Sequence, residues 1–238
     1  MPQAATLCLS GLIPGRTVFT WGCEEQGQLG RRITNRLHKA PWLTPGQCAL
    51  SHDIIDIGAG LYHSFAIRKN GKVYAWGSNN FGQTGIFKGA GQSDAGVLYP
   101  TEVQTLGKQW SITTVFGGKD HSLALTDQGQ CLTLGRIDNK ALGILSKKIP
   151  SSDIIYDTYG KPLILKAATP IAGIDDEIVF ATAGMDHSIA ITKDGKAYSW
   201  GFNAQHQTGL SLGDEIEEPT LLQNKHVSGK HLASFSRC

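Results

Sequence analysis

Hydrophobic and polar residues alternate with a period of two in several short stretches of this chain. The stretches "HSFAI" (63–67) and "VYAW" (73–76) have the pattern of two β-strands. Asn70-Gly71 stands between them and can supply the positive φ that a tight hairpin turn requires. No stretch shows the 3.6-residue period of an amphipathic helix. The pattern therefore predicts antiparallel β-hairpins.

The hairpin recurs along the chain. Three segments align without gaps, at residues 59–86, 117–144 and 183–210, and a partial copy covers 18–30. In each full copy 13 residues separate a histidine from a large apolar residue that precedes a glycine: His63 and Trp76, His121 and Leu134, His187 and Trp200. The segments between copies vary in length. Fixed spacing inside the copies indicates rigid structural units joined by variable loops.

Each unit extends beyond its hairpin. Strand-like runs precede the histidines at 53–60, 112–118 and 177–184, and we expect a further strand near Pro100, Pro170 or Pro219. The unit is then an antiparallel sheet of about four strands, which is the form of a β-propeller blade. A stacked solenoid is the alternative architecture, although the absence of a helical period excludes its helical forms.

Composition adds limits to this interpretation. The 29 glycines among 238 residues fit many tight turns, and the net charge of +2 gives no basis for nucleic-acid binding by bulk charge. The five cysteines are well separated, which favours free thiols in an intracellular protein: Cys8, Cys23, Cys48, Cys131 and Cys238. No P-loop and no metal-ligand motif is present, so we expect neither a cofactor nor a metal.

The sequence also lacks targeting signals of familiar kinds. Its N-terminus has no basic region before the apolar run, and Pro14-Gly15 interrupts that run, so it is a poor signal peptide. No stretch of 18 apolar residues occurs, which predicts that no helix crosses a membrane.

The repeated motif G-x-x-H-S-x-A-[IL], followed by a Trp-Gly step and G-Q-x-G, resembles the repeat of the regulator of chromosome condensation (RCC1) family. "WGCEEQGQLGRR" from Trp21 and "LGRIDNKALGI" from Leu134 are similar, within this family, to the exchange factor for the Ran GTPase. The insert "KKIPSSDIIYDTYGKPLILKAATP" (147–170) resembles its fungal form.

The resemblance implies an all-β fold, a seven-bladed propeller, of which this chain holds about four blades as an incomplete ring. We expect repeat blades over 18–222, with divergent segments at 1–17 and 223–238, and interpret the chain as the C-terminal part of such a propeller. The contribution of the insert at 146–170 stays open.

A feature present in every unit is expected to build the unit. We assign structural roles to six repeated residues: Trp21, His63, Trp76, Gly77, Trp200 and Gly201. The tryptophans are expected to pack between blades, and a buried imidazole to bond a neighbouring backbone carbonyl. Ser and His are adjacent on a strand and face opposite ways, so they cannot form a hydrolytic pair.

Residues that differ between units are better candidates for function. The resemblance implies that the loops before the histidines grip a GTPase, and it places Asp120, His121, Asp186 and His187 there. Arg31 matches a family arginine at the same interface. The alternatives are a solvated surface charge for Arg31 and loop capping for the two aspartates.

These residues lead to two hypotheses. The first is a guanine nucleotide exchange factor for a Ran-type GTPase, which stabilises the nucleotide-free GTPase without covalent chemistry. Because the resemblance places other important elements in earlier blades, we expect reduced activity. The second is a chromatin- or protein-binding propeller without exchange activity. In both, the resemblance implies a nuclear protein, and the cytoplasm is the alternative location. From the charge and hydropathy of the sequence we expect no membrane partner and no sequence-specific nucleic-acid binding. A hydrolase using Asp186 and His187 is least favoured, because no nucleophile is suitably placed.

Overall fold

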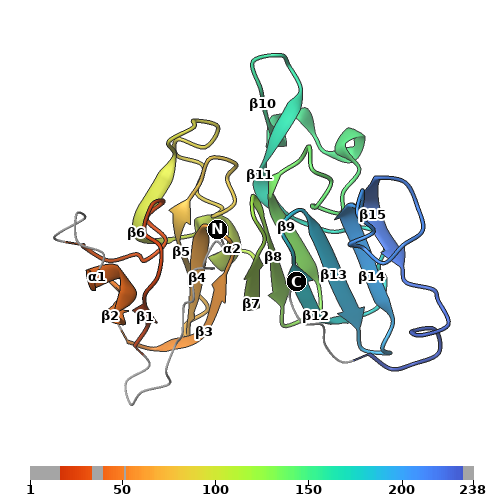
Figure 1. The fold of residues 1–238 in the computed structure, drawn as a ribbon, viewed down its shortest axis with the longest axis horizontal. Coiled ribbons are helices and arrows are strands. Elements are labelled where there is room, and N and C mark those ends of the chain that lie inside the picture. The colour runs from red at the N-terminus through yellow and green to blue at the C-terminus, as the bar shows by residue number, and fades with distance from the viewer. Residues whose placement is uncertain (1–16, 34–39, 51, 233–238) are drawn as a thin grey trace.

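The chain folds into four separate antiparallel sheets that stand side by side like blades (Figure 1). The computed structural model describes residues 17–33, 40–50 and 52–232. The expected segments 1–17 and 223–238 therefore lie largely or partly outside the described residues. The first sheet pairs two short strands beside a one-turn helix: β1 (Phe19–Thr20), β2 (Gly46–Gln47) and α1 (Ala40–Leu43).

The second and fourth sheets have the predicted four strands in sequential order. The second contains β3 (Ile54–Ala59), β4 (His63–Arg68), β5 (Val73–Ser78) and β6 (Gly96–Glu102), followed by α2 (Gln104–Gly107). The fourth contains β12 (Ile178–Ala183), β13 (His187–Thr192), β14 (Ala197–Phe202) and β15 (Glu215–Leu221). The last strand of each sheet runs through the proline that marked it in the sequence.

The third sheet has five strands, one more than the repeat predicts. Its order is β10-β11-β9-β8-β7. The strands are β7 (Ile112–Gly117), β8 (His121–Thr126), β9 (Cys131–Arg136), β10 (Ile154–Tyr156) and β11 (Pro162–Pro170). Two 3-10 turns precede β10: η1 (Ser146–Lys148) and η2 (Ser151–Asp153). The insert thus supplies both the fourth strand and an extra outer strand.

The hydrophobic core lies between neighbouring sheets. One apolar cluster joins the second and third sheets through Phe65, Val115 and Leu132, and another joins the third and fourth through Leu123 and Trp200. Because each strand turns alternate side chains to opposite faces, one sheet serves two such cores. Among the described residues the sheets form an open row, and the all-β, blade-like architecture expected from the sequence is confirmed.

The glycine of the Trp-Gly step is required by a close backbone approach. Gly77 has φ of 105°, and a Cβ there would lie 2.3 Å from the carbonyl oxygen of Tyr62. Gly201 has φ of 108°, and its Cβ would lie 2.6 Å from the carbonyl oxygen of Asp186. Any side chain would push the strand away from the loop that precedes the histidine.

Candidate partner-binding face

The repeated histidines mark one end of the second, third and fourth sheets. His63 pairs with Gly77, and His121 pairs with Gly135, so the loop before each histidine lies beside the loop that follows the Trp-Gly step. Backbone hydrogen bonds join these loops from sheet to sheet, from Leu61 N–H to the Gly118 carbonyl and from Lys119 N–H to the Met185 carbonyl. We call the surface formed by loops 60–62, 118–120 and 184–186 and the loops after β5, β9 and β14 the histidine face.

Two of the repeated histidines, His63 and His121, bond a serine of the next sheet through Nε2, where a backbone carbonyl was expected from the sequence. His63 Nε2 lies 2.7 Å from Ser122 Oγ, and His121 Nε2 lies 2.9 Å from Ser188 Oγ. Ser122 Oγ donates to the Gln83 carbonyl at 2.8 Å, which leaves its lone pairs to accept from the imidazole. We call the interface between two neighbouring sheets, with its hydrogen bonds and apolar cluster, a joint. The serine of each His-Ser pair contributes to the joint with the preceding sheet, and the histidine beside it contributes to the joint with the next sheet.

The tryptophans complete these joints. Trp76 and Trp200 are fully buried, and their Nε1–H groups donate to the carbonyls of Gln28 at 2.9 Å and Ala141 at 2.8 Å. Both carbonyls belong to the turn of the preceding unit, and each also accepts from a serine hydroxyl, at 3.3 Å from Ser64 in the first case. Trp21, in the first unit, is only half-buried.

His121 is a joint residue with no access to solvent. Its side chain is fully buried, and burial lowers its pKa to about 4, so the ring is neutral at physiological pH. His187 is half-buried, and burial lowers its pKa as well, against the opposing effect of Asp186. A partner on the histidine face can therefore touch His187 but not the imidazole of His121.

Asp120 forms an ion pair with an arginine of its own sheet, and this arginine also contacts the second sheet. Its side chain is buried, and Arg136 Nη1 lies 3.2 Å from its Oδ2. The same guanidinium also binds Asp138 and lies 4.3 Å above the ring centroid of Phe81, in the second sheet. Burial raises the pKa of Asp120 despite the lowering effects of Lys119 and Arg136. The carboxylate is thus held in place by a stacked arginine.

Asp186 occupies the equivalent position in the next unit. Asn139 Nδ2 donates to its Oδ1 at 3.2 Å, which links the third sheet to the fourth. The residue as a whole is half-buried, whereas Asp120 is only 6% exposed. The two aspartates are therefore held by residues of one loop, 136–139, and Asp186 is the more accessible of the two.

Arg31 lies in a separate part of the chain. Its Nη2 donates to the Thr44 carbonyl at 3.2 Å, and its guanidinium covers Gly46, where a Cβ would lie 2.6 Å from Cζ. Both contacts are within the first unit. Asp120 and Asp186 therefore form one cluster with the loop 136–139, and Arg31 is packed against its own sheet.

Three members of the cluster were not identified from the sequence: Arg136, Asp138 and Asn139. A signal for the first was available, because the aligned copies have Ser78 and Phe202 where this unit has Arg136. An arginine found in only one of the three aligned copies indicates a contact specific to that unit. The sequence does not identify the contact, because Asp120 is brought beside Arg136 only when the sheet forms.

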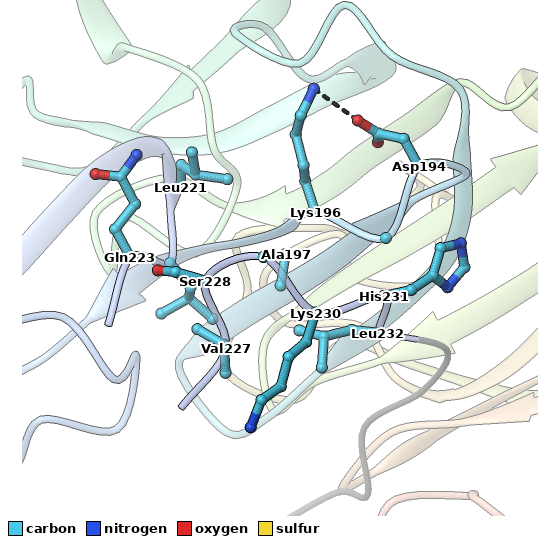
Figure 2. A pocket seen from close by; sticks show the side chains of 13 residues that line it. Asp194, Lys196, Ala197, Leu221, Gln223, Val227, Ser228, Lys230, His231 and Leu232 are labelled. Atoms are coloured by element: carbon cyan, nitrogen blue, oxygen red, sulfur yellow. Dashed lines mark ion pairs between the residues drawn. The ribbon is translucent and has the colours of Figure 1, made fainter. Parts of the chain in front are cut away.

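The described ranges contain no group of three metal-ligating side chains and no helix long and apolar enough to cross a membrane. Cys23, Cys48 and Cys131 are free thiols. A cavity of about 510 Å³ lies at the β13–β14 turn, the end of the fourth sheet away from His187 (Figure 2). Asp194 pairs with Lys196 there at 2.7 Å, and a second lysine, Lys230, also lines the cavity.

Repeated antiparallel sheets that pack face to face in sequence order define a protein of the β-propeller type. A sequence profile described as "RCC1-like domain" matches residues 6–236, and the chain belongs to this family. Protein pim1 of Schizosaccharomyces pombe is 38% identical over 88% of this chain and 38% of its own length. Guanine nucleotide exchange factor SRM1 of Saccharomyces cerevisiae is 32% identical over 87% of this chain and 42% of its own.

A solved structure shows the same fold. Prp20p of Saccharomyces cerevisiae, reported with its binding properties to Gsp1p and histones, superposes with a TM-score of 0.81 at 30% identity. The match covers 89% of this chain and 47% of the Prp20p chain. This chain therefore spans less than half the length of these relatives.

Proposed function

We propose that this chain acts in guanine nucleotide exchange on a Ran-type small GTPase. The observation that carries the proposal is the similarity to SRM1, named as an exchange factor, over 87% of this chain. That similar region includes the histidine face with its two positioned aspartates. The protein is then a regulator of a GTPase and performs no covalent chemistry of its own.

The physical basis is preferential binding of one state of the GTPase. A GTPase holds its nucleotide through a phosphate-binding loop, a lysine and Mg²⁺, all of which attract negative charge. A carboxylate held at the binding face, as Asp186 is by Asn139, can interact with these groups once the phosphates leave. Tighter binding to the empty GTPase than to the loaded one lowers the free energy cost of nucleotide release.

The test is release of a fluorescent guanine nucleotide from a purified Ran-type GTPase in the presence of the 238-residue chain. We expect measurable release that is slower than with a relative of full length. Asp186→Asn should weaken binding of the nucleotide-free GTPase by about tenfold, because it removes an accessible charge. Asp175→Asn is the matched control, since this exposed aspartate precedes β12 at the opposite end of the same sheet.

Unchanged binding in Asp186→Asn would refute the assignment of this residue. Absence of any binding or release by the unmodified chain would refute the proposed function itself.

A second function has its own support. The report on Prp20p names histones beside Gsp1p, and this chain is 30% identical to that protein. We therefore propose histone binding, and with it a nuclear location, as the alternative role. Retention on immobilised histones without any effect on nucleotide release would favour this alternative over exchange.

A further inference from the structure

The extra strand of the third sheet belongs to an arm that projects from the histidine face. β11 pairs with β9 so that Ile164 lies opposite Arg136, the last residue of β9. The residues before Ile164 therefore continue past the end of the sheet, at the end where Arg136 meets Asp120. β10 pairs with this part of β11, and the hairpin stands clear of the neighbouring sheets in Figure 1. We call residues 154–164 the tyrosine arm.

The base of the arm is buried in a small core of its own. Ile154 and Leu165 pack with Ile137, Leu142 and Ile149, all of them buried. This cluster is separate from those between the sheets and includes both the insert and the loop that follows β9. Hydrophobic burial thus stabilises the position in which the arm leaves the sheet.

Both neighbouring sheets hold the base as well. On one side Ile155 and Ile164 approach the loop after β5, where a Cβ on Gly91 would lie 3.8 Å from each. On the other side Glu217 of β15 accepts from Ser146 N–H at 2.9 Å, from Ser146 Oγ at 2.6 Å and from Lys140 Nζ at 3.3 Å. The arm is therefore fixed in direction by contacts on two sides.

The tip of the arm is ordered yet exposes its aromatic residues. Asp157 Oδ1 accepts from the N–H groups of Tyr159 and Lys161, both at 2.8 Å, and closes the turn. Tyr159 is 88% exposed, and Tyr156 is 43% exposed. Tyrosine combines a large apolar surface with a polar group and is enriched among the residues that dominate binding interfaces.

The distance between the arm and the aspartate cluster suits a single partner. Asp120 precedes β8, and β10 lies three strands further out in the same sheet, which corresponds to about 14 Å at the usual strand spacing. A globular domain of about 100 residues has a radius of gyration of about 13 Å, so one domain seated over the aspartates reaches the arm.

We propose that the tyrosine arm contacts the same GTPase that binds the histidine face, with Tyr159 and Tyr156 as affinity-determining contact residues. This inference rests on the proposed exchange function. Because the arm is displaced from the aspartate cluster, it touches the GTPase outside the region where the nucleotide is released. It contributes equally to the loaded and empty states, so it affects affinity and KM but not the rate at saturation.

The experiment uses the whole chain with the substitutions Tyr156→Ala and Tyr159→Ala combined. We expect the Kd for the nucleotide-free GTPase to rise by about tenfold, as for the loss of an interface anchor. The release rate at saturating concentrations stays unchanged. Of the two single variants at this position, Tyr159→Phe should keep most of the affinity that Tyr159→Ala loses, because phenylalanine keeps the aromatic ring. Tyr99→Ala is the matched control, since Tyr99 is 49% exposed on the outer strand β6 of another sheet.

The outcomes separate this inference from the function on which it rests. A Kd within twofold of the unmodified chain for the double variant would overturn the inference, provided that the unmodified chain binds the GTPase. If the unmodified chain binds no GTPase, the exchange function fails and the inference fails with it. A double variant that keeps its GTPase affinity but loses histone binding would also overturn the inference, and would assign the arm to the alternative partner.

Discussion

At the scale of single residues, His121 couples stability to pH. Its folded-state pKa of about 4 lies below the unfolded value of 6.5, because burial disfavours the charged ring. The unfolded state therefore binds more protons between these values, and stability must fall as the pH decreases from about 6.5 to about 4. Above pH 6.5 this contribution is constant.

We expect the change of His121→Gln to flatten this dependence. The amide can still donate to Ser188 Oγ but does not titrate, so the unmodified protein should lose up to about 3 kcal/mol more than the variant across this range. Urea unfolding at a series of pH values measures the difference. The raised pKa of Asp120 acts in the opposite direction in both proteins and cancels from the comparison. Parallel pH profiles for the two proteins would contradict the assignment.

At the scale of elements, the repeated strands were predictable and the joints between them were not. The period of two and the 13-residue spacing place β4, β5, β8, β9, β13 and β14 correctly. The partners of His63 and His121, however, lie 59 and 67 residues away, and no local pattern encodes such a pairing. The ion pair of Arg136 with Asp120 depends in the same way on how two strands close a hairpin.

The strand β10 could not be predicted from the repeat, since no other unit contains the segment 146–170. Besides its hydrophobic base, the segment that leads into it is held by one carboxylate of the next sheet, Glu217. Burial opposes ionisation of Glu217, but the hydrogen bonds from Ser146 and the charge of Lys140 outweigh it, so that the pKa is lowered. At neutral pH the Glu217 side chain is therefore a charged carboxylate that accepts hydrogen bonds from Ser146 and Lys140.

We therefore expect Glu217→Ala to release the base of the tyrosine arm without unfolding the sheets. Hydrogen exchange of the Ser146 amide and of β10 should become at least about tenfold faster, because local opening then costs less. Exchange in β13 and β14 should stay the same. Glu215→Ala is the control, since Glu215 is an exposed carboxylate on the same strand. Faster exchange throughout the fourth sheet would show that Glu217 supports the sheet and not the arm.

At the scale of the whole molecule, each described sheet packs only on its neighbours. The apolar clusters join the first sheet to the second, the second to the third and the third to the fourth. In such a row, stability is a sum of units and nearest-neighbour joints. Trp76 lies in the first joint and Trp200 in the third, so the second and third sheets and the joint between these sheets separate the two sites.

Substitutions in the first and third joints should therefore act independently of each other. Trp76→Phe and Trp200→Phe each remove one indole N–H donor, although Ser64 and Ser188 still satisfy the carbonyls, so each should cost about 1–2 kcal/mol. The double variant should lose the sum of the two costs within about 0.5 kcal/mol, as for independent sites. Urea unfolding of the four proteins gives the coupling energy. A coupling above about 1 kcal/mol would mean that strain passes through the two intervening sheets, and that the joints do not act as separate contacts.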